Sequence, residues 1–514
     1  MHGFETILIV FAAAILLSLV AQRLRAPFPP FVALAGAGVA FLPFTPEVGL
    51  DPALVLAIFV APVLVDAAYD SSPRDLKRNI IPITFLSLAA VAVTVIAVAV
   101  TARALMPEMP WAVAVTLGAI VAPPDAAAAT AVLRIIPAPY RMRTILEGES
   151  LFNDASALLI YRFAVAATIG AMPEGWDLAG GIAWAVVGSV VVGLGLAWLQ
   201  MRLNRLLTEA PPAILLQFIT AFGVWILAER LGLSAIITVV VFGMAVARMA
   251  ARGSAKLRAP TYAVWETVVF GLNVLAFMLV GLQIQPIWAE LAPPERQSYL
   301  VFAAAVLGVC VATRFVWVLG YHLVIRTKNH FFGANLPTDA ARPTTGGAVV
   351  VAWAGMRGVV SLAAAYALPL NFPQRDLILL SVFAVVMGTL VVQGLTLGPL
   401  IKLVGLGDDG VLDGEIRKAR EAIADAAIKH VDGRDDPAAR RMREEYHERR
   451  AALDTADGDG RVKIDVDHLA KEVLEAKRER LLEMRLTGEI SDAAYYQIEE
   501  ELDRHVLALM PVVR

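Results

Sequence analysis

Long apolar stretches alternate with short polar connectors from the amino terminus to about residue 406. Each stretch is roughly 20 residues long, the length an α-helix needs to cross about 30 Å of hydrocarbon while satisfying its own backbone hydrogen bonds. About thirteen spans are predicted: 4–22, 30–44, 52–70, 79–105, 111–133, 144–171, 178–203, 212–230, 233–250, 261–285, 298–325, 344–368 and 374–402. The pattern predicts an all-α integral membrane protein that crosses the bilayer many times.

The pattern changes after about residue 406. Charged residues become frequent, and apolar residues recur at helical spacing in 416–430, 437–453 and 467–486. Such amphipathic segments are typical of helices with one face in water. The sequence therefore predicts a transmembrane domain over residues 1–406 and a soluble helical tail over residues 407–514.

The composition agrees with a membrane location. Of the 514 residues, 58% are hydrophobic and 18% are charged, whereas charged residues make up about 25% of a typical soluble domain. There is no strand pattern and no phosphate-binding glycine loop after a strand, which argues against ATP hydrolysis, a redox cofactor and nucleic-acid binding. No cofactor is expected, and an ion gradient has to supply any driving force.

Basic residues gather in alternate connectors. Because short basic loops stay on the cytoplasmic side, their distribution predicts the orientation. The basic connectors contain Arg23, Arg25, Arg74, Lys77, Arg78, Arg134, Arg141, Arg143, Arg202, Arg205, Arg248, Arg252, Lys256, Arg258, Arg326, Lys328 and Arg342. The other side has scattered basic residues, such as Arg230, Arg296 and Arg375. We predict a multi-pass protein of the inner (plasma) membrane, with its amino terminus outside and its tail in the cytoplasm.

Asp125 follows two consecutive prolines, Pro123 and Pro124, in the middle of a predicted span. Proline lacks a backbone donor and clashes with the preceding turn, so the helix has to break there. A broken helix at membrane depth is tolerated where it is buried in protein or lines a water-filled cavity, and its freed carbonyls suit an ion. The alternative is a proline kink with a structurally paired aspartate.

A cluster of oxygen-bearing side chains opens the sixth span. Ser150 and Asp154 are four residues apart and share one helix face, whereas Glu149 and Asn153 share the neighbouring face. Hard cations prefer such oxygen ligands. Because burial disfavours the charged form of a carboxyl group, a cation and a proton can compete for the same group. Asp154 could instead be the structural partner of an intramembrane arginine.

A lone arginine, Arg357, lies between Gly355 and Gly358 in the twelfth span. We expect this buried guanidinium to need a carboxylate. Glu149, followed by Glu147, is the predicted partner, in an ion bridge that fixes helix geometry. The glycines favour close packing or a second helix break. Spans five and twelve would run in opposite directions, which predicts inverted repeats with two interrupted crossing helices.

The charged residues inside predicted spans also include Asp66, Arg162, Glu266 and Arg314. Asp66 follows a proline by four positions in the third span, and it either lines the ion path or lies near the cytoplasmic interface. Arg162, eight residues after Asp154, is expected to be a buried pairing partner. Glu266 and Arg314 are expected to be structural.

The segment 149–154, the Pro-Pro-Asp turn and the segment 355–358 together resemble the cation/proton antiporters of the NhaP and eukaryotic sodium/proton exchanger type. Residues 277–283 and 392–396 match the same family. The resemblance implies secondary active exchange of a monovalent cation for H⁺ and a role in pH homeostasis. Na⁺ is favoured as the cation, with K⁺ and Li⁺ left open.

The resemblance also implies a homodimer in the lipid bilayer, in which a six-helix core moves like an elevator against a dimerisation domain. Asp154 would be the essential carboxylate and bind Na⁺ with Asp125 and Ser150, near Asp66. Asn153 stands where electrogenic relatives have a second aspartate, which implies electroneutral exchange. The positions of Glu149 and Arg357 form an ion bridge in the family. Two departures are that Pro124 replaces a frequent threonine and that Asp66 replaces a frequent glutamate.

Two other classes of protein could use charged groups within the membrane. A passive cation channel could use acidic side chains but would not require a group that titrates with transport. An intramembrane aspartyl protease would also pair two aspartates, although its Gly-Asp signature is absent around Asp125 and Asp154. Neither class accounts for the predicted helix breaks together with the acidic cluster and the buried arginine.

Overall fold

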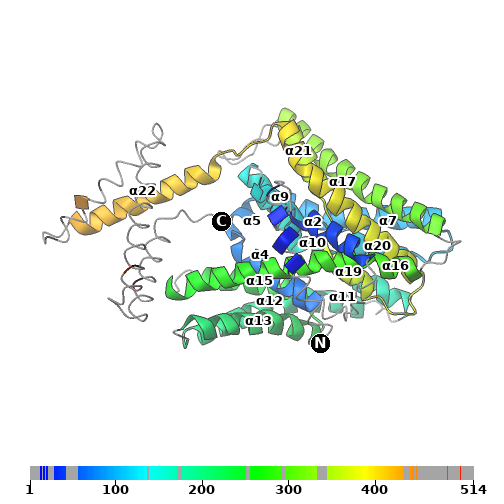
Figure 1. Ribbon diagram of the computed structural model, residues 1–514, viewed down its shortest axis with the longest axis horizontal. Helices are drawn as coiled ribbons and strands as arrows, with labels where there is room; N and C mark the ends of the chain where they lie inside the picture. The colour runs from blue at the N-terminus through cyan, green and yellow to red at the C-terminus, as the bar shows by residue number, and fades with distance from the viewer. Residues whose placement is uncertain are drawn as a thin grey trace. The chain divides into compact units, whose positions relative to one another are not determined.

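The computed structural model describes residues 28–41, 56–135, 138–170, 176–207, 209–250, 255–290, 296–332 and 344–432, together with isolated positions elsewhere. Every regular element in these ranges is a helix (Figure 1). The chain forms two compact units, Met1–Asp409 and Gly410–Arg514.

The larger unit begins with one set of helices up to residue 204. They are α2 (Phe28–Ala40), the π-helix η1 (Leu56–Val60), α4 (Ala61–Asp70), α5 (Pro73–Arg78), α6 (Ile80–Thr84), η2 (Phe85–Ala89), α7 (Ala90–Leu105), α8 (Trp111–Val121), α9 (Ala126–Ile135), α10 (Tyr140–Thr168), α11 (Trp176–Ala183), η3 (Trp184–Gly188) and α12 (Ser189–Asn204).

A second set completes that unit. They are α13 (Ala210–Arg230), α14 (Ala235–Ala250), α15 (Ala255–Leu282), α16 (Ile284–Glu290), α17 (Arg296–Phe332), α18 (Thr345–Trp353), α19 (Val359–Tyr366), α20 (Arg375–Gly388), η4 (Thr389–Gln393) and α21 (Gly394–Val404).

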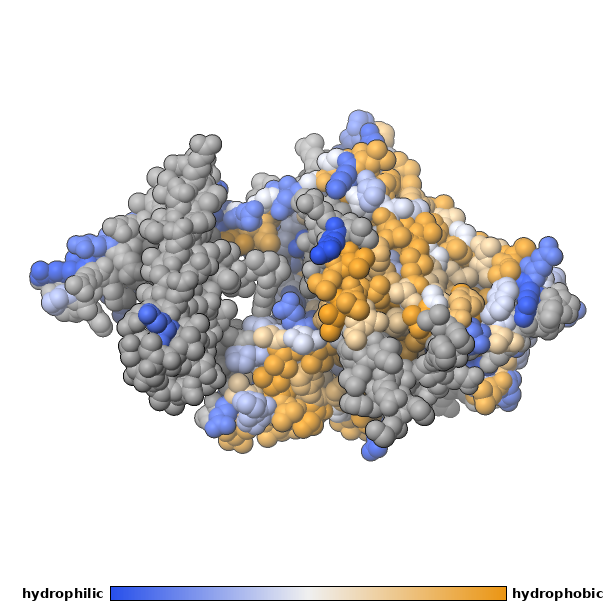
Figure 2. Space-filling model, viewed as in Figure 1, coloured by the Kyte–Doolittle hydropathy of each residue, from blue (hydrophilic) through white to orange (hydrophobic). Residues whose placement is uncertain are grey.

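Six of the described helical stretches are long and apolar enough to cross a membrane. They are Ile80–Leu105, Ala179–Asn204, Ala210–Arg230, Pro260–Ala289, Arg296–Phe331 and Arg375–Leu403, and α2, α8 and Ala235–Met249 are shorter apolar helices. Apolar side chains cover much of the described surface of this unit on the face shown in Figure 2. These features agree with a multi-pass membrane protein, whereas the count of thirteen spans and the orientation stay predictions.

Small residues let some helices approach closely. Along the contact between α2 and α15, a Cβ atom on Gly36 or on Gly281 would overlap the backbone of the other helix. The hydrophobic effect does not drive helices together inside a bilayer, so they associate largely through such close packing. Elsewhere, α17 lies alongside α20 and α7, and their apolar side chains form a buried cluster with α8.

Two helices are interrupted. The first interruption, residues 122–125, separates α8 from α9 at the consecutive prolines, as the sequence predicts. The second, residues 354–358, separates α18 from α19, so the Gly355 and Gly358 pair accompanies a helix break. The two interruptions touch, because the backbone N–H of Asp125 donates to the carbonyl of Met356 at 2.6 Å.

The smaller unit begins with α22 (Val411–Asp432), which contains the predicted helix 416–430. The predicted tail helices 437–453 and 467–486 lie outside the described residues, apart from isolated positions. The assignment of a transmembrane domain to 1–406 and of a cytoplasmic helical tail to 407–514 stays a prediction.

Candidate functional site

Three buried polar residues lie on one helix that faces the first interruption. Helix α10 runs without a break for 29 residues, from Tyr140 to Thr168. Glu149, Asn153 and Asp154 lie near its middle and are 1%, 0% and 7% exposed. A charged or amide side chain at such depth needs a partner or a function.

The carboxyl group of Asp154 is buried without a protein partner. No hydrogen bond or ion pair to it is formed within the part of the chain that the structure describes. Asp125, which is half-buried at the first interruption, lies close enough for the two carboxyl groups to interact electrostatically. The structure thus brings together the two aspartates that the sequence singled out.

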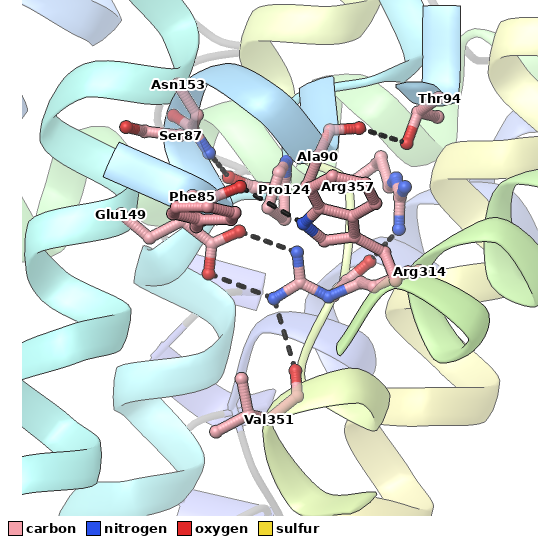
Figure 3. A network of polar contacts seen from close by, with 12 residues as sticks. Phe85, Ser87, Ala90, Thr94, Pro124, Glu149, Asn153, Arg314, Val351 and Arg357 are labelled. Atoms are coloured by element: carbon pink, nitrogen blue, oxygen red, sulfur yellow. Dashed lines mark hydrogen bonds and ion pairs between the residues drawn. The ribbon is translucent and has the colours of Figure 1, made fainter. Parts of the chain in front are cut away.

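Asn153 ties α10 to the first interruption. Its amide nitrogen Nδ2 donates to the carbonyl of Pro124 at 2.7 Å (Figure 3). Its amide oxygen Oδ1 is buried and has no hydrogen-bond partner among the described residues. Asn153 therefore satisfies one carbonyl freed by the helix break, and its own oxygen is left as a buried acceptor.

A small cavity lies beside the same interruption. It is lined by Pro124, Asp125, Ala129, Leu146, Glu149, Ser150 and Ala354. Asp125 and Ser150, two of the predicted ligands, therefore share one cavity. The other predicted site residues, Asp154, Asn153 and the half-buried Asp66 of α4, are not among its lining residues.

Glu149 pairs with Arg314 of α17, and not with Arg357 as predicted. Arg314 donates from NH1 to Oε1 of Glu149 at 2.6 Å and from NH2 to Oε2 at 3.0 Å, a bidentate ion pair (Figure 3). The second nitrogen also donates to the carbonyl of Val351 at 3.1 Å. Both residues are almost fully buried. Because their charges are opposite, the pair adds no net charge to the interior of the protein.

Arg357 is satisfied by backbone carbonyls. Its Nε donates to the carbonyl of Val121 at 3.1 Å, and its NH1 donates to the carbonyl of Gly355. Helix breaks leave such carbonyls without intrahelical partners. The expectation that a buried guanidinium needs a carboxylate was wrong here, because the two interruptions supply acceptors to Arg357.

Two other expectations about charged residues can be compared with the structure. Arg162 is exposed, and its NH1 donates to the carbonyl of Leu233 at 3.1 Å, so the predicted burial of Arg162 was wrong. Glu266 is exposed on α15. The sequence did show Arg314 as a lone charge in a span, but nothing in its spacing revealed which arginine would reach Glu149.

The comparison with protein families decides the class of protein. Residues 7–403 match the family model described as sodium/hydrogen exchanger, transmembrane. The chain belongs to this family. It is therefore a membrane-embedded cation/proton antiporter and not an enzyme, which removes the aspartyl protease and the passive channel as classes.

Named relatives of this antiporter come from several bacteria. An uncharacterized Na⁺/H⁺ exchanger of Mycobacterium tuberculosis is 29% identical over 99% of this chain and 96% of its own. The Na⁺/H⁺ antiporter NhaS2 of Synechocystis is 31% identical over 78% of this chain and 71% of its own.

A solved structure shares the fold of the antiporter. The sodium proton antiporter MjNhaP1 of Methanocaldococcus jannaschii superimposes with a TM-score of 0.59 and 18% identity. The match covers 79% of this chain and 100% of that one. At this identity the likeness concerns the fold alone.

Proposed function

We propose that this antiporter exchanges one monovalent cation, with Na⁺ favoured over K⁺ and Li⁺, for one H⁺ at a site formed by Asp154 and Asp125. Ser150 supplies a hydroxyl ligand, Asn153 fixes the interruption beside the site, and Asp66 lies on the path of the ion. The exchange needs no cofactor.

The buried carboxyl group of Asp154, without a protein partner, carries this proposal. An ionised carboxylate removed from water and left unpaired is costly, so the group either takes a proton or pairs with a cation. The two states exclude each other. Cation entry then releases a proton, and proton entry releases the cation, which is the coupling that antiport requires.

The charges around the site favour a one-to-one exchange. Glu149 and Arg314 form a neutral pair. The other charged groups at the two interruptions are the aspartates, Asp125 and Asp154, and Arg357, which is bonded to backbone carbonyls. One negative charge is left, and one monovalent cation or one proton neutralises it. Asn153 adds no charge where a third carboxylate would require a second cation or proton. Electroneutral exchange follows from this balance.

The two touching interruptions support alternating access. The interruption between α8 and α9 contacts the interruption between α18 and α19. In transporters with inverted repeats, broken helices meet in this way near the midplane of the membrane. In the proposed cycle the protein is a homodimer in the lipid of the plasma membrane, with its tail in the cytoplasm. The core that carries Asp154 moves like an elevator against the dimerisation domain.

Transport in proteoliposomes tests the proposal. Purified protein is reconstituted, a pH gradient is imposed, and its dissipation is followed after adding Na⁺, K⁺ or Li⁺. Wild type should dissipate the gradient on cation addition, and Asp154→Asn should not. Asp413→Asn changes an exposed aspartate of α22 and serves as the matched control.

Three results would contradict parts of the proposal. Retained exchange in Asp154→Asn would remove the central assignment. Proton flux without an added cation would favour a passive pathway. A rate that changes with an imposed membrane potential would remove electroneutrality.

A further inference from the structure

We propose that Thr389 is a positioning residue that sets the place of Asp125 through a single peptide unit of the second interruption. The inference rests on the proposed role of Asp125 in the ion site. Thr389 itself touches neither carboxyl group of the proposed site in any contact that the structure gives it.

The peptide unit between Met356 and Arg357 is held from both sides. Its carbonyl oxygen, on Met356, accepts from the N–H of Asp125 at 2.6 Å. Its N–H, on Arg357, donates to Oγ1 of Thr389 at 3.0 Å. The carbonyl and the N–H of a trans peptide point in opposite directions within one plane. Asp125 and Thr389 therefore lie on opposite sides of this peptide.

The hydroxyl of Thr389 fixes which way that peptide points. A hydroxyl has one hydrogen to donate, and Thr389 donates it within its own helix, to the carbonyl of Val385 at 2.7 Å, with Val386 at 3.3 Å as a second acceptor. Toward the peptide it can only accept. A flipped peptide would place a carbonyl against this acceptor, so the hydroxyl selects the orientation in which the carbonyl faces Asp125.

The first interruption has few other backbone donors to hold Asp125. The N–H of Ala122 donates back into α8, to the carbonyl of Gly118, and Pro123 and Pro124 carry no N–H. The next backbone donor is therefore the N–H of Asp125. On the other side of Asp125, its carboxylate lies against Gly358, where a Cβ atom would overlap Oδ2. Residues 356–358 thus help to set the position of Asp125, and Thr389 holds the peptide between Met356 and Arg357.

Burial makes the contact consequential. Thr389 is 1% exposed and Arg357 is 1% exposed, so water does not replace the hydroxyl when it is removed. A buried N–H without an acceptor is costly. The peptide can relieve that cost by rotating, which withdraws the carbonyl of Met356 from Asp125. Thr389 also opens the π-helix η4, and π-turns inside α-helices are frequent at functional sites.

The test compares cation dependence of exchange in Thr389→Val, Thr389→Ser and Thr389→Cys. Valine keeps the shape and removes the hydroxyl, serine keeps the hydroxyl, and cysteine offers a weak acceptor. The KM for Na⁺ should rise about fivefold to tenfold in Thr389→Val, rise less in Thr389→Cys, and stay near the wild-type value in Thr389→Ser.

Thr94→Val is the matched control. The Thr94 hydroxyl is also buried, but it donates to the carbonyl of Ala90 in its own helix and is the acceptor of no described contact (Figure 3). If Thr389→Val does not fold, the ranking of the serine and cysteine variants decides the matter.

Two outcomes overturn the inference. One is a wild-type KM in Thr389→Val or Thr389→Cys. The other is a KM that follows side-chain volume, so that serine is as impaired as valine. Because wild-type exchange and the Asp154→Asn result are measured in the same assay, failure of the inference is distinguishable from failure of the proposed function.

Discussion

The two helix interruptions meet but differ in chemistry. The first, residues 122–125, contains two prolines and an aspartate, and the second, residues 354–358, contains two glycines and an arginine. Prolines remove donors and leave carbonyls open, whereas glycines leave space where side chains would otherwise lie. The first interruption therefore has open carbonyl acceptors, and the second has an arginine donor and space for side chains.

The contacts follow that division. The open carbonyls of Val121 and Pro124 accept from Arg357 and Asn153. In the second interruption the missing Cβ atom of Gly358 gives room to Asp125, and that of Gly355 gives room to Arg314. The comparison teaches that a polar site inside a membrane can be built from two incomplete backbone segments, with the donors of one serving the acceptors of the other.

The largest expected effect comes from breaking the ion pair beside the second interruption. Arg314→Met leaves Glu149 buried without its bidentate partner, and removing one member of a buried pair costs about 3 to 5 kcal/mol. Arg357→Met removes donors to two carbonyls and leaves the ion pair intact, so it should destabilise less. Thermal unfolding in detergent should show the lower midpoint for Arg314→Met.

A double variant controls for the change in shape at position 314. Glu149→Gln combined with Arg314→Met removes both charges and should recover part of the lost midpoint. A lower midpoint in Arg357→Met than in Arg314→Met would instead restore the pairing of Glu149 with Arg357 that the sequence predicts.

Filling the glycine space should have a smaller, mainly functional effect. Gly358→Ala places a methyl group where Oδ2 of Asp125 lies. The methyl group would also overlap Cγ and Cβ of Asp125, so the whole side chain of Asp125 has to be displaced when the variant folds. Displacing a ligand in this way should raise the KM for Na⁺ about tenfold.

Gly308→Ala is the control for that substitution. Gly308 lies on α17, and a Cβ atom there meets nothing within 4 Å. A Gly358→Ala variant with the KM of Gly308→Ala would show that Asp125 does not need its place over residue 358.

The first interruption could be predicted from the sequence with less ambiguity than the second. Consecutive prolines break a helix by local sterics, so the end of α8 followed from two residues. Glycines in residues 354–358 only permitted a break, and the alternative of close packing was equally open. What decides the matter is the contact with the first interruption, some 230 residues earlier in the chain (Asp125 to Met356), which no local pattern contains.

The candidate site shows the same limit. Spacing along one helix brought out Asp154, Asn153 and Ser150, because their arrangement depends on α10 alone. The partner of Glu149 was predicted wrongly, because Arg314 and Arg357 are both lone arginines in apolar spans and the choice depends on tertiary packing. Thr389 gave no signal, since a threonine in an apolar helix is usually bonded to its own backbone.

The smallest expected effect lies away from both interruptions, at the start of α10. Asp75, buried on α5, accepts from the hydroxyl of Tyr140 at 2.9 Å and from Nε of Arg74 at 3.1 Å. Burial by itself raises the pKa of Asp75, but hydrogen bonds involving Ser72, Tyr140 and Arg74 outweigh it and hold the pKa below its ordinary value of 3.8. A lowered pKa means that the folded protein favours the ionised carboxylate.

Tyr140→Phe removes one of those hydrogen bonds and should lower the free energy of unfolding by about 1 kcal/mol at neutral pH. A depressed carboxyl pKa contributes stability above 3.8, and this stability is lost as the pH falls through the folded-state value. The difference in unfolding midpoint between wild type and Tyr140→Phe should therefore be full at pH 7 and shrink below pH 3.8.

Tyr161→Phe, on the same helix, is the control, because the Tyr161 hydroxyl has no hydrogen bond among the described residues. If the proposed site depends on the interruptions, the KM for Na⁺ should stay unchanged in Tyr140→Phe, and a shift comparable to that of Gly358→Ala would extend the site to the start of α10.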